Sequence, residues 1–170
     1  MKSLHRFFPL SLLAFFCLFL MACPVSSSYP LGEKGKEKID KNMIGKWKTD
    51  KADHEAKKIN VRMADDFSYD VTVEEEGSSF MADTKEFKGW LTKLEGKTFF
   101  VLQEINEGKA TETYYVYHIT IGKDGFTTHD IGCLVDGTSA ITSTEAYRNE
   151  VKASMSKENF LSSEAKWVKQ

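Results

Sequence analysis

The stretch Phe67-Ser68-Tyr69-Asp70-Val71-Thr72-Val73-Glu74 alternates strictly between apolar and polar side chains. In an extended chain successive side chains point to opposite faces, so the four apolar residues share one face and the four polar residues share the other. A helix would scatter the same residues around its circumference. The stretch therefore predicts a β-strand with one buried and one solvated face.

Segments of similar character flank this strand along the chain. In addition to 67–74, we expect strands at 44–49, 57–63, 80–93, 98–104, 112–121 and 126–135. Short turn-forming segments separate them, at 65–66, 76–78, 95–96, 106–108 and 124–125. Because connections this short join antiparallel neighbours, the sequence predicts an antiparallel meander.

One strand in the middle of the meander, 98–104, is apolar on both faces. Phe99 and Val101 point to one side, whereas Phe100 and Leu102 point to the other. One of these faces belongs to the core of the sheet. The other face needs a separate cover.

A helix in the last quarter of the chain is the expected cover. Thr142 and Glu145 fit a capping box, and the segment behind them carries apolar residues at helical spacing, namely Tyr147, Val151 and Met155. The alternating segment 165–169 predicts a last strand. Seven or eight meandering strands with one C-terminal helix before the last strand predict a mainly β protein whose sheet is a closed or nearly closed barrel, because closure removes the exposed edges.

The triplet Gly45-Lys46-Trp47 on the first strand, the meander and the late helix together resemble a lipocalin or a related calycin over 43–169. In that family the Gly-x-Trp closes the barrel floor, so the resemblance implies that the barrel-closing residues are Gly45 and Trp47. The family's Trp packs beneath an Arg from near the C-terminus, where this chain offers Lys166 and Lys169. Barrels of about eight strands are able to hold one small ligand. If this barrel is hollow, the candidate ligand-binding residues are Trp90, Phe99, Tyr115, Tyr117 and His129.

The chain begins with a segment typical of a secretion signal, in which Lys2 and Arg6 precede an almost wholly apolar run at 7–20. This run of 14 residues is shorter than the roughly 20 needed for a permanent transmembrane helix. Its end, Leu20-Met21-Ala22-Cys23, resembles the lipobox of bacterial lipoproteins. The resemblance implies removal of a signal peptide at 1–22 and acylation of the new N-terminal Cys23.

Acylation would make membrane lipid the first partner of the chain. Several acyl chains, at about 0.8 kcal/mol per buried methylene, form a stable anchor, whereas a single chain is marginal. In Gram-negative lipoproteins an Asp after the Cys tends to retain the protein at the inner membrane, so by resemblance Pro24 favours the outer membrane. Ser-rich and then Lys/Glu-rich residues follow to 42, and the lipidated N-terminus with this segment, 23–42, is predicted as a flexible tether.

Without the signal peptide the chain has 148 residues, which is one ordinary domain at 43–170 plus the tether. This mature chain carries 21 basic and 25 acidic side chains, so nucleic acid is not an expected partner. Its one thiol besides Cys23 is Cys133, among apolar neighbours, and a buried inert side chain is expected there. The sequence contains no Gly-x-Ser-x-Gly, His-Glu-x-x-His or phosphate-binding glycine loop, so we expect no catalytic residue, no cofactor and no enzyme.

His118 and His129 fall on the two strands of one predicted hairpin, and its loop decides whether they meet. If Lys123-Asp124 is a two-residue loop, the histidines lie opposite each other with Cβ atoms about 5 Å apart, a spacing that suits a shared metal ion. If Gly125 instead takes the left-handed position of a three-residue loop with a bulge, His118 faces Asp130. The second register is favoured because it gathers the apolar residues on one face. Neither register supplies three convergent ligands, so no metal site is expected.

Two function classes follow from these features. The first is a membrane-anchored lipoprotein of the bacterial cell envelope whose lipocalin-like barrel binds or carries a small apolar ligand. The alternative is an accessory or interaction lipoprotein with a filled barrel that acts through its outer surface. An interior plugged by the barrel's own side chains would favour the second class.

Overall fold

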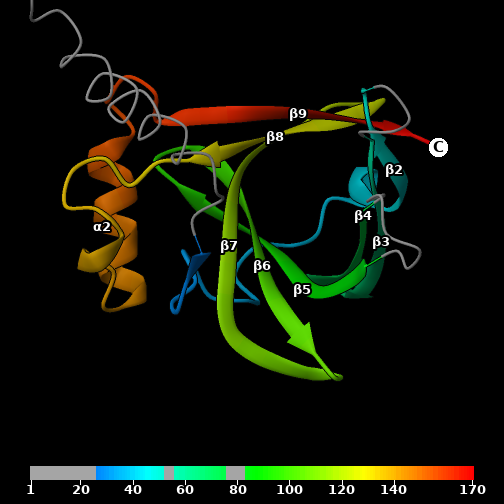
Figure 1. The fold of residues 1–170 in the computed structure, drawn as a ribbon, viewed down its shortest axis with the longest axis horizontal. Coiled ribbons are helices and arrows are strands. Elements are labelled where there is room, and N and C mark those ends of the chain that lie inside the picture. The colour runs from blue at the N-terminus through cyan, green and yellow to red at the C-terminus, as the bar shows by residue number, and fades with distance from the viewer. Residues whose placement is uncertain (1–25, 52–55, 76–82) are drawn as a thin grey trace, which may run out of the picture.

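The computed structural model describes residues 26–51, 56–75 and 83–170 (Figure 1). In this part of the chain the strands are β1 (Ser26–Ser27), β2 (Gly45–Thr49), β3 (Lys57–Asp65), β4 (Ser68–Glu75), β5 (Asp83–Leu94), β6 (Lys97–Asn106), β7 (Lys109–Ile121), β8 (Gly125–Ile131) and β9 (Leu161–Lys169). One α-helix, α2 (Thr144–Ser154), precedes β9, and short 3-10 helices span Lys41–Met43 and Thr138–Ala140.

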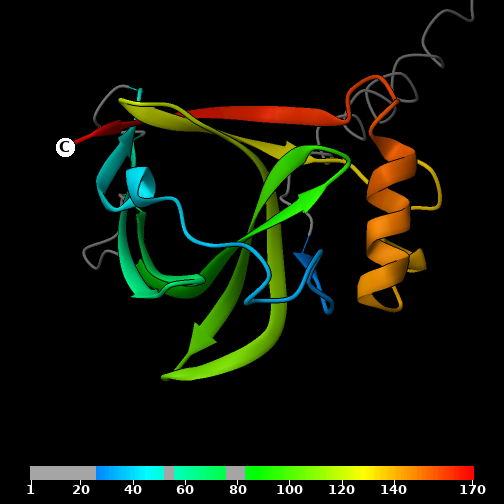
Figure 2. The ribbon, with the colours of Figure 1, turned by 180° about the vertical axis from the view of Figure 1, so that it is seen from behind.

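Strands β2 to β9 form a closed antiparallel barrel. Each strand from β2 to β7 pairs with the next along the chain, β7 also pairs with β8, and β9 closes the circle between β8 and β2. The predicted meander, the barrel closure and the single late helix are thereby confirmed. Helix α2 stands at one side of the barrel, and the C-terminus lies on the opposite side (Figures 1 and 2).

Tight turns at predicted places fold the meander. Between β5 and β6, Glu95 and Gly96 have φ values of 48° and 76°, and Glu107 and Gly108 repeat this geometry between β6 and β7. Two successive residues with positive φ match the twist of an antiparallel hairpin, and glycine adopts this conformation without steric cost. These two-residue turns set the register of the three central strands.

Several predicted boundaries differ from the observed ones. Strand β8 ends at Ile131 rather than at 135, and β9 begins at Leu161 rather than at 165. The N-cap of α2 is Ser143, whose hydroxyl accepts a hydrogen bond from the Ala146 amide at 3.0 Å, so the capping box predicted at Thr142 is displaced by one residue. The first residues of the strand expected at 80–93 lie outside the described part of the chain. Among the described residues, no helix is both long and apolar enough to cross a bilayer.

The segment 26–42 lies against the barrel, so the prediction of a flexible tether is wrong for it. Strand β1 pairs with the middle of β7, and Leu31 is 0% exposed. The Trp90 indole N–H donates to the Gly32 carbonyl at 2.8 Å within the protein interior. Because these contacts hold the segment 26–42 on the barrel, the folded domain extends to Ser26.

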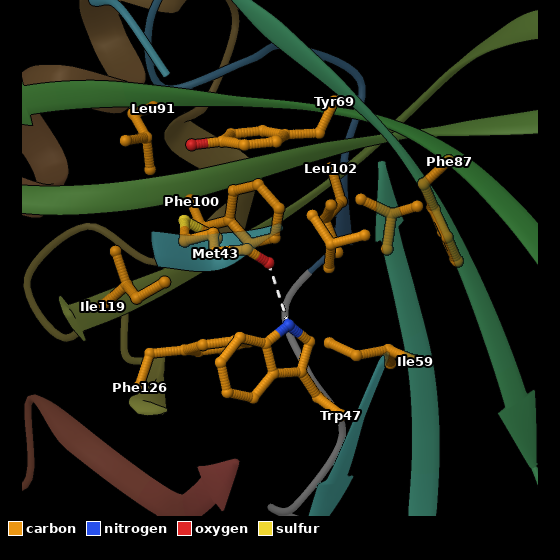
Figure 3. Packing of buried hydrophobic residues seen from close by; sticks show 12 residues of the cluster. Met43, Trp47, Ile59, Tyr69, Phe87, Leu91, Phe100, Leu102, Ile119 and Phe126 are labelled. Carbon is orange, nitrogen blue, oxygen red and sulfur yellow. Dashed lines mark hydrogen bonds between the residues drawn. The ribbon is translucent and has the colours of Figure 1, made fainter. Parts of the chain in front are cut away.

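Two apolar clusters stabilise the fold. The inner cluster lies inside the barrel and receives side chains from every barrel strand (Figure 3). Its buried members are Met43, Trp47, Ile59, Val61, Tyr69, Val71, Phe87, Leu91, Phe100, Leu102, Ile119 and Phe126. The outer cluster joins the outward faces of β5, β6 and β7 to helix α2 and the N-terminal segment. Its buried members are Leu31, Trp90, Leu94, Phe99, Val101, Val116, Ile131, Tyr147, Val151 and Phe160.

Candidate functional site

The barrel interior is the first candidate site, and side chains of the inner cluster fill it at the level of Gly89. This glycine lies between the inward-facing residues of β5, and a Cβ atom added to it would lie 2.7 Å from the Phe100 ring. The ring therefore rests directly on the backbone of β5. On its other side, Phe100 meets Tyr69 edge-on, with ring centroids 5.8 Å apart. At this level the Phe100 ring and the Leu102 side chain cover the inner face of β5.

Trp47 is buried in the inner cluster. Its indole N–H donates to the Met43 carbonyl at 2.8 Å, and its ring packs edge-on against Phe126 at 5.1 Å between centroids (Figure 3). The ammonium group of Lys169 lies 5.6 Å from the centre of the indole, within range of a cation–π interaction. Gly45 enters β2 with a φ of 145°, a conformation that favours glycine. The chain thus brings a lysine of its last strand to the indole of Trp47.

The interior is less tightly closed beside β7. Tyr115 and Tyr117 pack against the inner cluster but keep part of their surface exposed to solvent. Phe87 meets Tyr115 edge-on, with ring centroids 5.9 Å apart. These two tyrosines are the candidate ligand-binding residues that the structure places at the barrel interior.

The other candidate ligand-binding residues do not join them. Trp90 and Phe99 belong to the outer cluster, because they alternate with the inward-facing Leu91 and Phe100 on the same strands. His129 lies on the outer side as well. The preceding residue, Thr128, faces the inner cluster, because its hydroxyl accepts a hydrogen bond from the indole of Trp167, and successive residues of a strand point to opposite faces. The five candidates therefore divide between two faces of the sheet. They do not form one binding site.

The hairpin of β7 and β8 has the register that the sequence argument did not favour. Lys123-Asp124 forms the two-residue loop, and the Gly122 amide donates to the Gly125 carbonyl at 2.8 Å. His118 and His129 are therefore paired across the strands, with ring centroids 5.9 Å apart. The apolar pattern misled the prediction because Ile131 and Cys133, which it grouped with the inward-facing Tyr115 and Tyr117, pack with the outer cluster.

A break in the pairing of β8 with β9 gives His129 an acidic neighbour. Thr128 pairs with Ala165 but Asp130 pairs with Ser162, so two residues of β9 face His129. One of them, Glu164, places its carboxylate 3.2 Å from His129 Nε2. In the part of the chain that the structure describes, no group of three His, Cys, Asp or Glu side chains is arranged to hold a metal ion.

His118 sits in a setting that disfavours its charged form. Burial lowers its pKa below the ordinary 6.5, and the positive charge of Lys97 and the neighbouring His129 lower it further. Its ring also meets Phe99 of the outer cluster edge-on at 5.7 Å. The imidazole is therefore neutral near pH 7 and acts as part of the packing between strand and cluster.

Cys133 has the environment of an unreactive thiol. Burial and the nearby carboxylate of Glu150 raise its pKa to about 11, so the nucleophilic thiolate is scarce at neutral pH. This environment agrees with the chemistry expected for a cysteine among apolar neighbours.

A buried carboxylate that the sequence argument missed fixes the loop after β8. Glu150 on α2 accepts hydrogen bonds from the Val135 amide at 3.0 Å and the Asp136 amide at 2.9 Å. The hydroxyl of Ser154 accepts from the Leu134 amide at 2.8 Å and donates to Glu150 at 3.0 Å. Burial alone would raise the pKa of Glu150, but these donors together hold it below its ordinary value. The loop is thereby clamped to α2, while the side chains of Leu134 and Val135 remain exposed.

A polar cleft of about 490 Å³ lies between the N-terminal segment, the end of β5 and the start of α2. Its lining residues are Gly32, Glu33, Lys36, Glu37, Thr92, Lys93, Thr144, Glu145 and Arg148. Arg148 donates to the carbonyls of Leu31 and Lys93, both at 3.1 Å, and Lys93 pairs with Glu37 at 3.3 Å. Both cations therefore have partners within the protein, and their contacts connect the N-terminal segment with β5 and α2.

Cys23, the predicted acylation site, lies outside the described residues. No protein-family model matches the chain, and no curated protein or solved structure is significantly similar to it. The function has to be argued from the packing of the barrel and from the residues around it.

Proposed function

We propose that this chain is a lipid-anchored lipoprotein of the bacterial cell envelope whose barrel is a rigid, filled scaffold that acts through its outer surface. The observation that carries the proposal is the contact of Phe100 with Gly89, which leaves no space for a side chain at Gly89 on the inner face of β5. A carrier of an apolar ligand needs a cavity that its own side chains do not occupy. The packing of twelve buried side chains in the inner cluster supports a filled interior.

The envelope location rests on the sequence Leu20-Met21-Ala22-Cys23 and on the apolar run before it. Acylated Cys23 would hold the domain at a membrane, and Pro24 favours the outer membrane if the organism is Gram-negative. Among the described residues Cys133 is a free cysteine, so no disulfide stabilises this part of the domain. The two apolar clusters stabilise it instead. Such a domain suits an oxidising compartment as well as a reducing one.

A carrier of a small apolar ligand is the second candidate. It is favoured by the partial exposure of Tyr115 and Tyr117, which face the inner cluster and yet remain in contact with solvent. A ligand held there would cover the two aromatic rings at the side of the barrel and would not enter the level of Phe100. The site would be shallow.

Native mass spectrometry of the protein extracted from its own membranes separates the two candidates. The filled scaffold predicts a single mass, that of the acylated chain alone, at collision energies that keep apolar ligands bound. A co-purifying lipid-sized mass that disappears in the variant Tyr115→Ala would instead establish the carrier. Tyr29→Ala, which changes an exposed tyrosine outside the barrel, is the matched control.

The anchor is tested separately by Cys23→Ala and by the mass of the mature N-terminus. The native protein should fractionate with membranes, and the variant should remain in the soluble fraction or keep its signal peptide. An unmodified Cys23 on purified mature protein would refute the anchor and leave the argument about the barrel interior intact.

A further inference from the structure

The chain enters the folded domain at one defined place on the barrel. Strand β1 pairs with β7 at Tyr114 and Tyr115, and β8 pairs with the same strand from Tyr117 onward. The other edge of β7 is occupied by β6 along this stretch, so β1 and β8 lie end to end on one edge. The N-terminal chain therefore arrives at the point where β8 leaves the sheet towards α2.

The distance from this point to the proposed anchor is short. Only Pro24 and Val25 separate Cys23 from Ser26. A fully extended chain spans at most about 3.6 Å per residue, so Cys23 lies within roughly 11 Å of Ser26. If Cys23 carries lipid, as proposed above, this part of the barrel must lie close to the bilayer surface.

The loop that leaves β8 presents exposed apolar side chains beside this point. Leu134 and Val135 are 45% and 46% exposed, and they follow the end of β8 by three and four residues. Their backbone amides are held by Ser154 and Glu150, so the loop cannot fold the two side chains inward without losing these hydrogen bonds. Exposed apolar residues that gather in one place on a surface mark a contact with a partner or a membrane.

We propose that Leu134 and Val135 insert into the boundary between headgroups and acyl chains of the bilayer that holds Cys23, and thereby fix the orientation of the barrel on the membrane. This inference rests on the proposed lipid anchor. The proposed contact depends on the apolar side chains alone. The next residue, Asp136, is acidic, so this loop has no electrostatic attraction to anionic headgroups. Residues of this kind at an interface add to the binding of an acylated chain.

The structure supplies a matched control on the opposite side of the barrel. Met63 on β3 is 47% exposed, as much as Leu134, and β3 lies four strands from β7 in either direction around the barrel. A single anchor point cannot bring both residues to the same flat membrane. Contact at Leu134 therefore requires Met63 to remain in water.

The test uses the full mature chain, acylated in its host and reconstituted into vesicles of phosphatidylethanolamine and phosphatidylglycerol with or without bromine on the acyl chains. Leu134→Trp and Val135→Trp each add one indole at the proposed contact, and Met63→Trp adds one at the control position. We expect brominated lipid to quench the added fluorescence of the first two variants at least twofold more than that of the third. The native Trp47 and Trp90 are buried and Trp167 is half-buried, and because all three variants keep these three residues, their fluorescence is a common background that the native protein measures.

Equal quenching at the three positions, or quenching at Met63→Trp alone, would overturn the inference. If the protein still floats with the vesicles in that case, the proposed anchor remains supported. Failure of the native protein to float with vesicles would overturn both the anchor and the orientation that depends on it. Circular dichroism of each variant identifies any that misfolds. If either Leu134→Trp or Val135→Trp misfolds, the other still tests the proposed contact.

Discussion

The inner and outer clusters are both apolar and share strands β5 to β8, but the chain assembles them in different ways. The inner cluster is made almost entirely by alternate residues of continuous strands, and the closed barrel surrounds it on all sides. The outer cluster lies on one side of the sheet and depends on Leu31 from the N-terminal segment and on Tyr147 and Val151 from helix α2. Closure confines the inner cluster, whereas the outer cluster exists only because two distant segments return to cover it.

The largest effect is expected from Phe100→Ala, which empties the centre of the inner cluster. The barrel around it is closed by hydrogen bonds, so it cannot collapse to fill the space, and truncation of a buried Phe costs about 4 kcal/mol. We expect this loss in the free energy of unfolding, measured by urea denaturation. The transition should remain cooperative, because all the strands share this cluster.

The neighbouring residue on the same strand is the comparison. Phe99→Ala removes an equal side chain from the outer cluster, and helix α2 is free to move inward, so we expect a smaller loss of about 3 kcal/mol. Hydrogen exchange should become faster in α2 for Phe99→Ala and in β4 and β5 for Phe100→Ala. A larger loss for Phe99→Ala, or faster exchange throughout the barrel in that variant, would show that the two clusters form a single unit.

An intermediate effect is expected from Leu31→Ala. This side chain is fully buried in the outer cluster and belongs to a segment that has the composition of a linker. Removal of a buried Leu side chain costs about 2 to 3 kcal/mol, so urea denaturation should show a loss of this size. The variant should also expose the Trp90 indole, whose partner is the adjacent Gly32 carbonyl, to acrylamide quenching.

Tyr29→Ala, two residues earlier, is the matched control for this segment. Tyr29 is exposed, and substitutions of exposed residues change stability by less than about 0.5 kcal/mol. If Leu31→Ala is equally harmless, the N-terminal segment does not contribute to the outer cluster in solution. The domain would then begin near β2, where the sequence places its boundary.

Local patterns in the sequence were sufficient to predict the barrel. The alternation at 67–74 and the turns at 95–96 and 106–108 lie within single hairpins, and the capping pattern near Thr142 placed α2 to within two residues. Closure followed because an open meander of this length leaves edges exposed. Each of these inferences depends on residues that are close together in the chain.

The composition of the candidate site was not predictable in the same way. Phe99 and Phe100 are the same amino acid on successive positions, so the sequence does not say which of them faces the interior. Leu31 lies in a polar segment, and only the burial of its side chain by residues of α2 reveals its role. The loop of Lys123-Asp124 has two compatible geometries, and the apolar residues at the end of β8 and after it, Ile131 and Cys133, pack with the outer cluster and so favoured the wrong one.

The smallest effect is expected at the boundary of the outer cluster, where His118 meets Phe99. The folded state holds the pKa of His118 below 6.5 through burial, Lys97 and His129, and it therefore binds a proton less readily than the unfolded chain. Between pH 6.5 and the lowered pKa, the unfolded state takes up a proton that the folded state refuses, so stability falls as the pH falls through this window. Nuclear magnetic resonance of the His118 ring should report the lowered pKa, and urea denaturation from pH 7.5 to 5 should show the loss.

His118→Gln should remove this pH dependence, and Lys97→Gln should reduce it by raising the pKa of His118 towards 6.5. Glu164 pairs with His129 and not with His118, so Glu164→Gln is the control that leaves the Lys97 contribution in place. A measured pKa of His118 at or above 6.5 would contradict the prediction. It would mean that water reaches the ring freely, and that the outer cluster, unlike the closed inner cluster, is open along the edge formed by β7 and β8.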